Sequence, residues 1–282
     1  MSDKFCENRA EKMISIVNNA GERRLVLIIA QSDPDSIGSM GTLSLIFDKI
    51  QPGVRVKSYY CGGIGDIQNQ AIMNRFDLER RFRPIAEYSE EEGDLYVLLD
   101  SHSMQDKRLP ECLRGKKPSI IIDHHQFDHS IHESDEQFIW IDDGAGSTCT
   151  MVTMLAICPS IDFPFSSERN RYLATLLSLG IYNDTKNLTN VNDKDIEMYW
   201  ELWKYSDHKD LKKLIWYRLP RSYFLKLAKA IGNQEQVGTN LVTTVGIIKP
   251  EEFVEPALIA DYLIRMGDEK NFVTLVIVGA II

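Results

Sequence analysis

Short apolar runs alternate with longer amphipathic segments along the first half of the chain. The apolar or alternating runs predict strands at residues 24–30, 54–60, 95–99, 119–122 and 138–141. Apolar positions at helical spacing predict helices at 4–19, 39–50, 67–76, 147–157 and 167–180. Strands that alternate with helices are typical of α/β proteins. We therefore expect an α/β fold with a doubly wound, mostly parallel sheet.

The rest of the chain is patterned differently. The pattern predicts interrupted helices at residues 194–232. A strand at 241–248, a helix at 256–266 and a strand at 272–282 are predicted to follow. Two strands and one helix bury too little surface to fold independently. We therefore expect this last unit to be incomplete as given, or to depend on packing against the first. The expected division is a main domain at 1–190, a helical connector at 191–237 and a partial smaller domain at 238–282.

Composition and charge narrow the class of protein. The chain has 282 residues, of which 44% are hydrophobic, and its net charge is −9. Such an acidic protein lacks the basic surface that binds duplex nucleic acid. Five cysteines without a CxxC pair indicate free thiols in a reducing compartment. The polar first residues exclude a signal peptide, and no apolar run could span a bilayer, so we expect a cytoplasmic protein with no membrane partner.

Candidate chemistry lies just after three predicted strands. These strands are followed in turn by Asp33 and Asp35, by Asp100, and by Asp123-His124-His125. Open parallel sheets form ligand sites beyond the carboxyl ends of their strands, so these groups are expected to converge. Pro34 favours an extended Asp33, which would place the carboxylates of Asp33 and Asp35 on one face.

Each group also has an ordinary structural interpretation. Asp33 and Asp35 suit a capped turn before a helix, which we would favour for that pair alone. Asp100 could simply end a strand, and the two histidines could form a surface pair. The combination of three acid-bearing strand ends with a later Gly-x-x-x-Asp-Thr, at Gly180 to Thr185, favours a functional site.

Four motifs in this order resemble the DHH phosphoesterase superfamily. They are residues 31–39 (QSDPDSIGS), Asp100, Asp123-His124-His125, and residues 180–185 (GIYNDT). The chain is most similar to the branch of nanoRNases and 3′-phosphoadenosine-5′-phosphate phosphatases, which is related to RecJ exonucleases and family II pyrophosphatases. The resemblance implies that residues 1–190 form the DHH catalytic domain. Residues 238–282 would begin the α/β DHH-associated domain, whose glycine-rich substrate motif is absent because the sequence stops first.

The resemblance also implies a two-metal site, with Mn²⁺ expected and Mg²⁺ as the alternative. One ion would take Gln31, Asp33 and Asp100, and the other would take Asp35, Asp100, His124 and Asp184. Asp123, His124 and His125 would be catalytic, with Asp123 orienting a neighbouring side chain, and His125 and Ser147 would contact the substrate. Two divalent ions would offset the repulsion among four crowded carboxylates.

Gln31 departs from the family pattern, which has a histidine at this position. A neutral amide is a poor ligand for a transition metal, so we expect weaker binding of that ion. His102, two residues after Asp100, could compensate, although a solvent-facing loop histidine is the interpretation we favour.

The expected function is metal-dependent hydrolysis of short oligonucleotides or small phosphorylated nucleotides. The alternatives are a catalytically weakened nucleotide-binding protein and an exopolyphosphatase-like or pyrophosphatase-like hydrolase. The expected partners are a small phosphorylated substrate or a short single-stranded oligonucleotide, and a homodimer is one expected state of the chain.

Overall fold

A computed structural model describes residues 3–64, 66–127, 133–238, 240–248, 255–264 and 272–273. Its internal contacts divide the chain into two compact units. The first comprises Met1–Gly63 and Ala71–Trp216, and the second comprises Ile64–Gln70 and Tyr217–Ile282. The three-part division expected from the sequence stays a prediction.

Within the described residues, six parallel strands form the sheet of the first unit. They are β1 (Arg24–Ile29), β2 (Arg55–Tyr60), β3 (Phe82–Pro84), β4 (Leu95–Leu99), β5 (Pro118–Asp123) and β6 (Phe138–Ile141). Their order across the sheet is β3-β2-β1-β4-β5-β6. The predicted α/β class with a doubly wound parallel sheet is confirmed. From β1 the chain adds strands toward one side of the sheet (β2, β3), and from β4 it adds them toward the other side (β5, β6). In open α/β sheets, ligands bind at such a switch point in the strand order.

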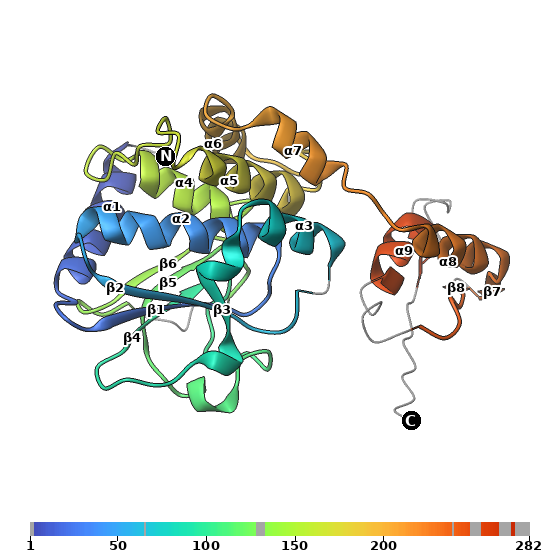
Figure 1. The fold of residues 1–282 in the computed structure, drawn as a ribbon, viewed down its shortest axis with the longest axis horizontal. Coiled ribbons are helices and arrows are strands. Elements are labelled where there is room, and N and C mark those ends of the chain that lie inside the picture. Colours follow the sequence, from blue (N-terminus) through green and yellow to red (C-terminus); the bar gives the residue numbers. More distant parts are fainter. Residues whose placement is uncertain are drawn as a thin grey trace. The chain divides into compact units, whose positions relative to one another are not determined.

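Helices cover one face of this sheet (Figure 1). They include α1 (Asp3–Asn18), α2 (Pro34–Ile50), α4 (Thr148–Ile157) and α5 (Arg171–Asp184), while α6 (Asp193–Trp203) and α7 (His208–Ile215) pack on α5. The α2 helix is buried along most of its length because it lies against α4 and α5. Residues after β4, including Met104, Leu109 and Leu113, cover Tyr96 and Leu98 on the opposite face.

In the first unit, two predicted helix limits were wrong and one strand was missed. The α2 helix begins at Pro34 rather than near residue 39, because Asp33 is its N-cap and proline suits the first helical position. The α5 helix begins at Arg171 and continues through Asp184, so the GIYNDT motif is helical from Gly180 to Asp184. The β3 strand was missed because it has three residues and ends in a proline, as edge strands can.

The second unit has its own small core, formed by Tyr223, Ala230, Ile259 and Leu263. These residues belong to α8 (Arg221–Gly232) and to α9 (Glu255–Ile264), the helix expected at 256–266. Three strands accompany them: β7 (Glu235–Val237), β8 (Asn240–Val242) and β9 (Phe272–Val273). The expected strand at 241–248 is therefore much shorter, and β7, which pairs with it antiparallel, was missed. Residues 274–282 of the last expected strand lie outside the described residues.

The division between the units falls within the α3 helix (Ile67–Arg75), after Gln70. Among the described residues, no helix combines the length and apolarity that a membrane span requires.

A buried ion pair joins the starts of β1 and β4, at the opposite edge of the sheet from the acidic motifs. The Arg24 guanidinium donates to both carboxylate oxygens of Asp94, at 2.9 and 2.6 Å, and also to Glu91 at 2.8 Å. The side chains of Arg24 and Asp94 are 5% and 1% exposed. Burial alone would raise the pKa of Asp94, but Arg24 and the other hydrogen-bond donors hold it below its usual value.

We expect Arg24→Met to lower the free energy of unfolding by about 3 kcal/mol, because it leaves a buried carboxylate without its cation. Chemical denaturation at neutral pH measures this change. The pKa of Asp94 is lowered in the fold, so its contribution is complete above the ordinary value of 3.8 and is lost as the pH falls through the lower folded value. An unchanged unfolding free energy would contradict the assigned role of the pair. Arg55→Met, at an exposed pair with Glu91, is the matched control and should cost about 1 kcal/mol or less.

Candidate active site

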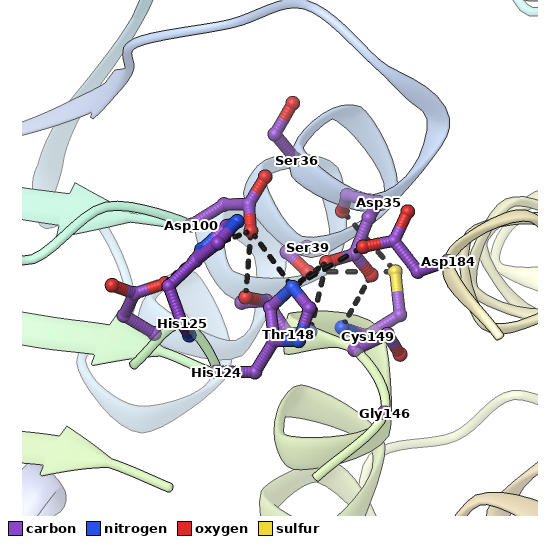
Figure 2. A network of polar contacts seen from close by, with 12 residues as sticks. Asp35, Ser36, Ser39, Asp100, His124, His125, Gly146, Thr148, Cys149 and Asp184 are labelled. Atoms are coloured by element: carbon purple, nitrogen blue, oxygen red, sulfur yellow. Dashed lines mark hydrogen bonds and ion pairs between the residues drawn. The ribbon is translucent and has the colours of Figure 1, made fainter. Parts of the chain in front are cut away.

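Three carboxylates from distant parts of the first unit converge on one imidazole nitrogen. His124 Nε2 lies 3.2 Å from Asp184 Oδ2, 3.5 Å from Asp100 Oδ1 and 3.9 Å from Asp35 Oδ2. Figure 2 shows the His124 ring between Asp100 on one side and Asp35 and Asp184 on the other. The structure thus brings together four of the residues that the sequence analysis selected.

The convergence follows from the topology of the sheet. Asp35 lies in the first turn of α2 just after β1, Asp100 follows β4, and His124 follows β5. Asp184 comes from the last turn of α5. The extended Asp-Pro-Asp geometry expected from the sequence was wrong, because Asp35 is already helical and only Asp33 is extended.

The carboxylate of Asp35 is held by the N-terminus of α4. Its oxygens accept the backbone N–H groups of Thr148 at 2.8 Å and Cys149 at 2.7 Å. Both donors belong to the first turn of α4, where N–H groups lack partners within the helix and attract negative charge. The fully buried Asp35 side chain is therefore fixed in direction toward His124.

Asp100 adopts a backbone conformation that is uncommon for a residue with a side chain. Its φ is 55°, in the left-handed region that aspartate tolerates better than most residues. Its backbone N–H still donates to Ile122 O at 3.0 Å, and Thr148 Oγ1 donates to Asp100 Oδ1 at 3.1 Å. Left-handed backbone at the end of β4 thus turns this carboxylate into the site.

The site concentrates negative charge in a buried place. Burial and the charge of Asp184 raise the pKa of Asp35 to about 6. Burial, with the charges of nearby acids, also raises the pKa of Asp100 well above its ordinary value. Burial lowers the pKa of His124, but Asp100, Asp184 and Asp35 outweigh this effect and raise it to about 11. A bound cation would offset the negative charge of these carboxylates.

The donor set fits a hard divalent cation. Two groups of described residues have ligand atoms close enough to share an ion, namely Asp35 with His124 and Asp184, and Asp100 with His124 and His125. His124 Nε2 is buried and, among the described residues, has no well-aligned hydrogen-bond partner. A buried imidazole nitrogen that faces three carboxylate oxygens is a mixed N and O donor set that a divalent metal ion can use.

Asp123 orients two histidines on the other side of the site. The fully buried carboxylate lies 2.8 Å from His125 Nδ1 and 2.6 Å from His102 Nδ1. Burial would raise the pKa of Asp123, but its bonds with His125 and His102 lower it, so it stays ionised. The favoured interpretation of His102 as a solvent-facing histidine was therefore wrong. Among the described residues, His102 belongs to neither group of candidate metal ligands.

Two predicted ligands of one ion are placed differently. Gln31 is exposed, and its Oε1 accepts a hydrogen bond from Arg108 Nη1 at 2.8 Å. Asp33 Oδ1 accepts the backbone N–H and the hydroxyl of Ser36, at 2.9 and 3.0 Å, in a capping box for α2. Among the described residues, Asp33 belongs to neither group of candidate metal ligands.

Ser147 is buried and serves as the N-cap of α4, since its Oγ accepts the backbone N–H of Thr150 at 3.0 Å. Its contact with a substrate stays a prediction.

Asp195 is a fully buried acid that was not predicted from the sequence. It accepts the backbone N–H of Gly146 at 2.9 Å and the Thr150 hydroxyl at 2.7 Å. Asp195 thus fixes the turn that precedes α4. A capping box with Asn192, at the start of α6, was the available signal in the sequence.

Close packing between helices places Asp35 against α5. A Cβ added at Gly180 would lie 2.5 Å from Cys149 Sγ and 2.9 Å from Asp35 Cα. Cys149 Sγ itself lies 3.2 Å from Asp35 O and 3.4 Å from Ser39 Oγ. Glycine at 180 is therefore required for α2, α4 and α5 to meet beside the site.

We expect Gly180→Ala to destabilise the chain by about 1–3 kcal/mol, because the new methyl group would press on the Asp35 backbone. Thermal or chemical unfolding measures the change. Gly41→Ala is the matched control, since its Cβ would meet only side-chain atoms of Leu173 and Phe82 at 3.4 Å. Equal stability of the two variants would show that the contact at Gly180 does not constrain the site.

Comparison with known proteins places this geometry in a family. The model of the DHH family, N-terminal domain, matches residues 25–181, which is more than half of the chain. No curated protein matches the chain. Among solved structures, an exopolyphosphatase-related protein from Bacteroides fragilis aligns with a TM-score of 0.66 and 16% identity, over 89% of this chain and 76% of that one.

A protein from Methanococcus jannaschii, described as a candidate family II inorganic pyrophosphatase, aligns with a TM-score of 0.51 and 21% identity. The alignment covers 85% of this chain and 78% of that one. At these identities the likeness shows a shared fold, and the family match rests on residues 25–181. The chain belongs to the DHH family.

Proposed function

We propose that the chain is a divalent-metal-dependent hydrolase that cleaves a phosphoester or phosphoanhydride bond in a small substrate. The observation that carries this proposal is the convergence of Asp35, Asp100 and Asp184 on His124 Nε2 at the switch point of the sheet. Family membership supports it, as does the fold that the chain shares with an exopolyphosphatase-related protein and a candidate pyrophosphatase.

His124, Asp35, Asp184 and Asp100 would hold the ion, and we propose Mn²⁺, with Mg²⁺ as the alternative. When bound, such an ion offsets the carboxylate charges and polarises a phosphoryl oxygen. The protein contributes orientation, since α4 fixes Asp35 and the left-handed turn fixes Asp100. His125 is half exposed, and its bond with Asp123 raises its pKa, so it can donate a proton or a hydrogen bond to a phosphate oxygen.

A pocket of about 420 Å³ adjoins these residues and suits a small ligand. Its lining includes Asp100, Asp123 and His125 together with His102, Lys107 and Arg108. Basic side chains beside a candidate metal site favour an anionic, phosphate-bearing substrate. We propose small phosphorylated nucleotides or short single-stranded oligonucleotides as the substrate class, with polyphosphate or pyrophosphate as the alternative.

A second candidate function is nucleotide binding without turnover. The observation that favours it is the engagement of Gln31 by Arg108, where the family pattern has a metal-binding histidine. A binding protein would retain affinity for a phosphorylated ligand and release no phosphate or shorter oligonucleotide.

A screen of the chain with added Mn²⁺ tests the proposal. Dinucleotides, 3′-phosphoadenosine 5′-phosphate, pyrophosphate and polyphosphate are the substrates to compare, with product release as the measurement. Turnover of any one that depends on Mn²⁺ and is abolished by a chelator supports the hydrolase. Binding of all four without turnover supports the second candidate.

We expect Asp184→Asn to weaken Mn²⁺ binding by about tenfold or more, corresponding to about 1.4 kcal/mol, because it removes a charged ligand. Calorimetric titration of Mn²⁺ measures the affinity. Asp48→Asn, at the other end of α2 from Asp35 and exposed, is the control and should bind Mn²⁺ as the parent does. Equal affinity in the Asp184 variant would remove Asp184 from the metal site.

A further inference from the structure

A guanidinium group lies beside the candidate metal site, at the position that departs from the family pattern. Arg108 lines the same pocket as Asp100, Asp123 and His125. Its Nη1 donates to Gln31 Oε1 at 2.8 Å. The amide that stands in place of the motif histidine is therefore bonded to a cation of the chain itself.

Asp106 holds Arg108 in this position. Arg108 Nε lies 3.1 Å from both Asp106 carboxylate oxygens, and Nη2 lies 2.6 Å from Oδ2. The backbone N–H of Arg108 also donates to Asp106 Oδ1 at 2.8 Å. These bonds and the one to Gln31 use one N–H each of Nε, Nη1 and Nη2. Among bonds between described residues, one N–H on each terminal nitrogen is left for an oxygen of a ligand.

The charge of Arg108 acts on the acids that the family pattern assigns to one ion. The hydrogen bond with Asp106 raises the pKa of Arg108, and burial lowers it. The charges of Asp106, Asp100 and Asp33 raise it further, so the guanidinium lies within the field of Asp100 and Asp33. Arg108 thus places a permanent positive charge on Gln31, which the family pattern assigns to the second ion, and in the same pocket as Asp100.

The two groups of candidate metal ligands among the described residues point to one ion. Both candidate groups of metal ligands contain His124, and the His124 atom that faces their acids is Nε2. One imidazole nitrogen binds one ion, so the two groups describe a single site around it. At the other expected ion, Gln31 is bonded to Arg108, and Asp33, whose Oδ1 caps α2 through Ser36, belongs to neither candidate group.

We propose that Arg108 takes the place of the second ion, so that the chain binds one divalent ion at His124 and uses the Arg108 guanidinium to bind a substrate phosphate group. The proposal rests on the proposed function for the identity of the substrate. A guanidinium offers paired N–H donors that match two phosphate oxygens, and it stays charged at all relevant pH values. Asp100 faces His124 and lines the same pocket as Arg108.

Counting bound Mn²⁺ tests the first half of the proposal. We expect the parent chain to bind one Mn²⁺ per chain, measured by calorimetry and by elemental analysis after dialysis. Arg108→Gln combined with Gln31→His removes the competing cation and supplies an imidazole, so this double variant should gain a second ion. Two tight ions in the parent chain, or a folded double variant that still binds one, would overturn the assignment.

Binding of inorganic phosphate to the Mn²⁺-loaded chain tests the second half. Arg108→Gln should weaken phosphate binding about tenfold, since it removes hydrogen bonds from a charged donor, and should leave one Mn²⁺ bound. Arg80→Gln, at an exposed arginine paired with its neighbour Asp77, is the matched control and should change neither. Unchanged phosphate affinity in the Arg108 variant would overturn the proposal.

These outcomes separate this inference from the proposed function. A chain that binds one Mn²⁺ and loses phosphate affinity with Arg108→Gln, but hydrolyses none of the substrates, refutes the enzyme and supports the role of Arg108. A chain that hydrolyses a substrate with two bound ions supports the enzyme and refutes that role.

Discussion

Mutual repulsion of buried carboxylates is the constraint on which the site depends. Asp35 and Asp100 are buried, and Asp184 faces the same imidazole. Acids brought this close cannot all stay ionised unless positive charge is placed among them. Burial, together with the charges of the neighbouring acids, raises the pKa values of Asp35 and Asp100. The chain meets the requirement partly with its own groups, which are the α4 N-terminus at Asp35 and, without an ion, protonated His124. A divalent ion bound at His124 Nε2 would take the place of that proton and meet the rest.

Helix packing turns this electrostatic requirement into a fixed geometry. The α4 N-terminus can face Asp35 only because α2, α4 and α5 approach closely at Gly180 and Cys149. Asp195 in turn holds the turn before α4 through Gly146. The ligand directions are therefore set by residues that do not themselves face the metal site, as is common around metal centres.

The sequence predicted the sheet and its acidic edge well because both depend on local pattern. Apolar runs identify strands directly, and an acid after a strand has a defined place in a parallel sheet. The same reasoning missed Asp195 and misread His102, because their partners, Gly146 and Asp123, are distant in sequence and carry no periodic signal. It also missed Arg108, which looks like any loop arginine until the fold brings it to Gln31, and it placed the start of α2 late because Asp33 belongs both to a motif and to a helix cap.

The Arg24–Asp94 pair and the acidic site lie at opposite ends of the same two strands, β1 and β4. The ion pair and the acidic site are therefore separated by about the length of one strand, so a substitution at one of them leaves the contacts of the other intact. Such separation gives the carboxyl edge freedom to change its side chains over evolutionary time while the strand pairing is retained. Gln31, which stands in place of the motif histidine and is bonded to Arg108, is one such change of side chain.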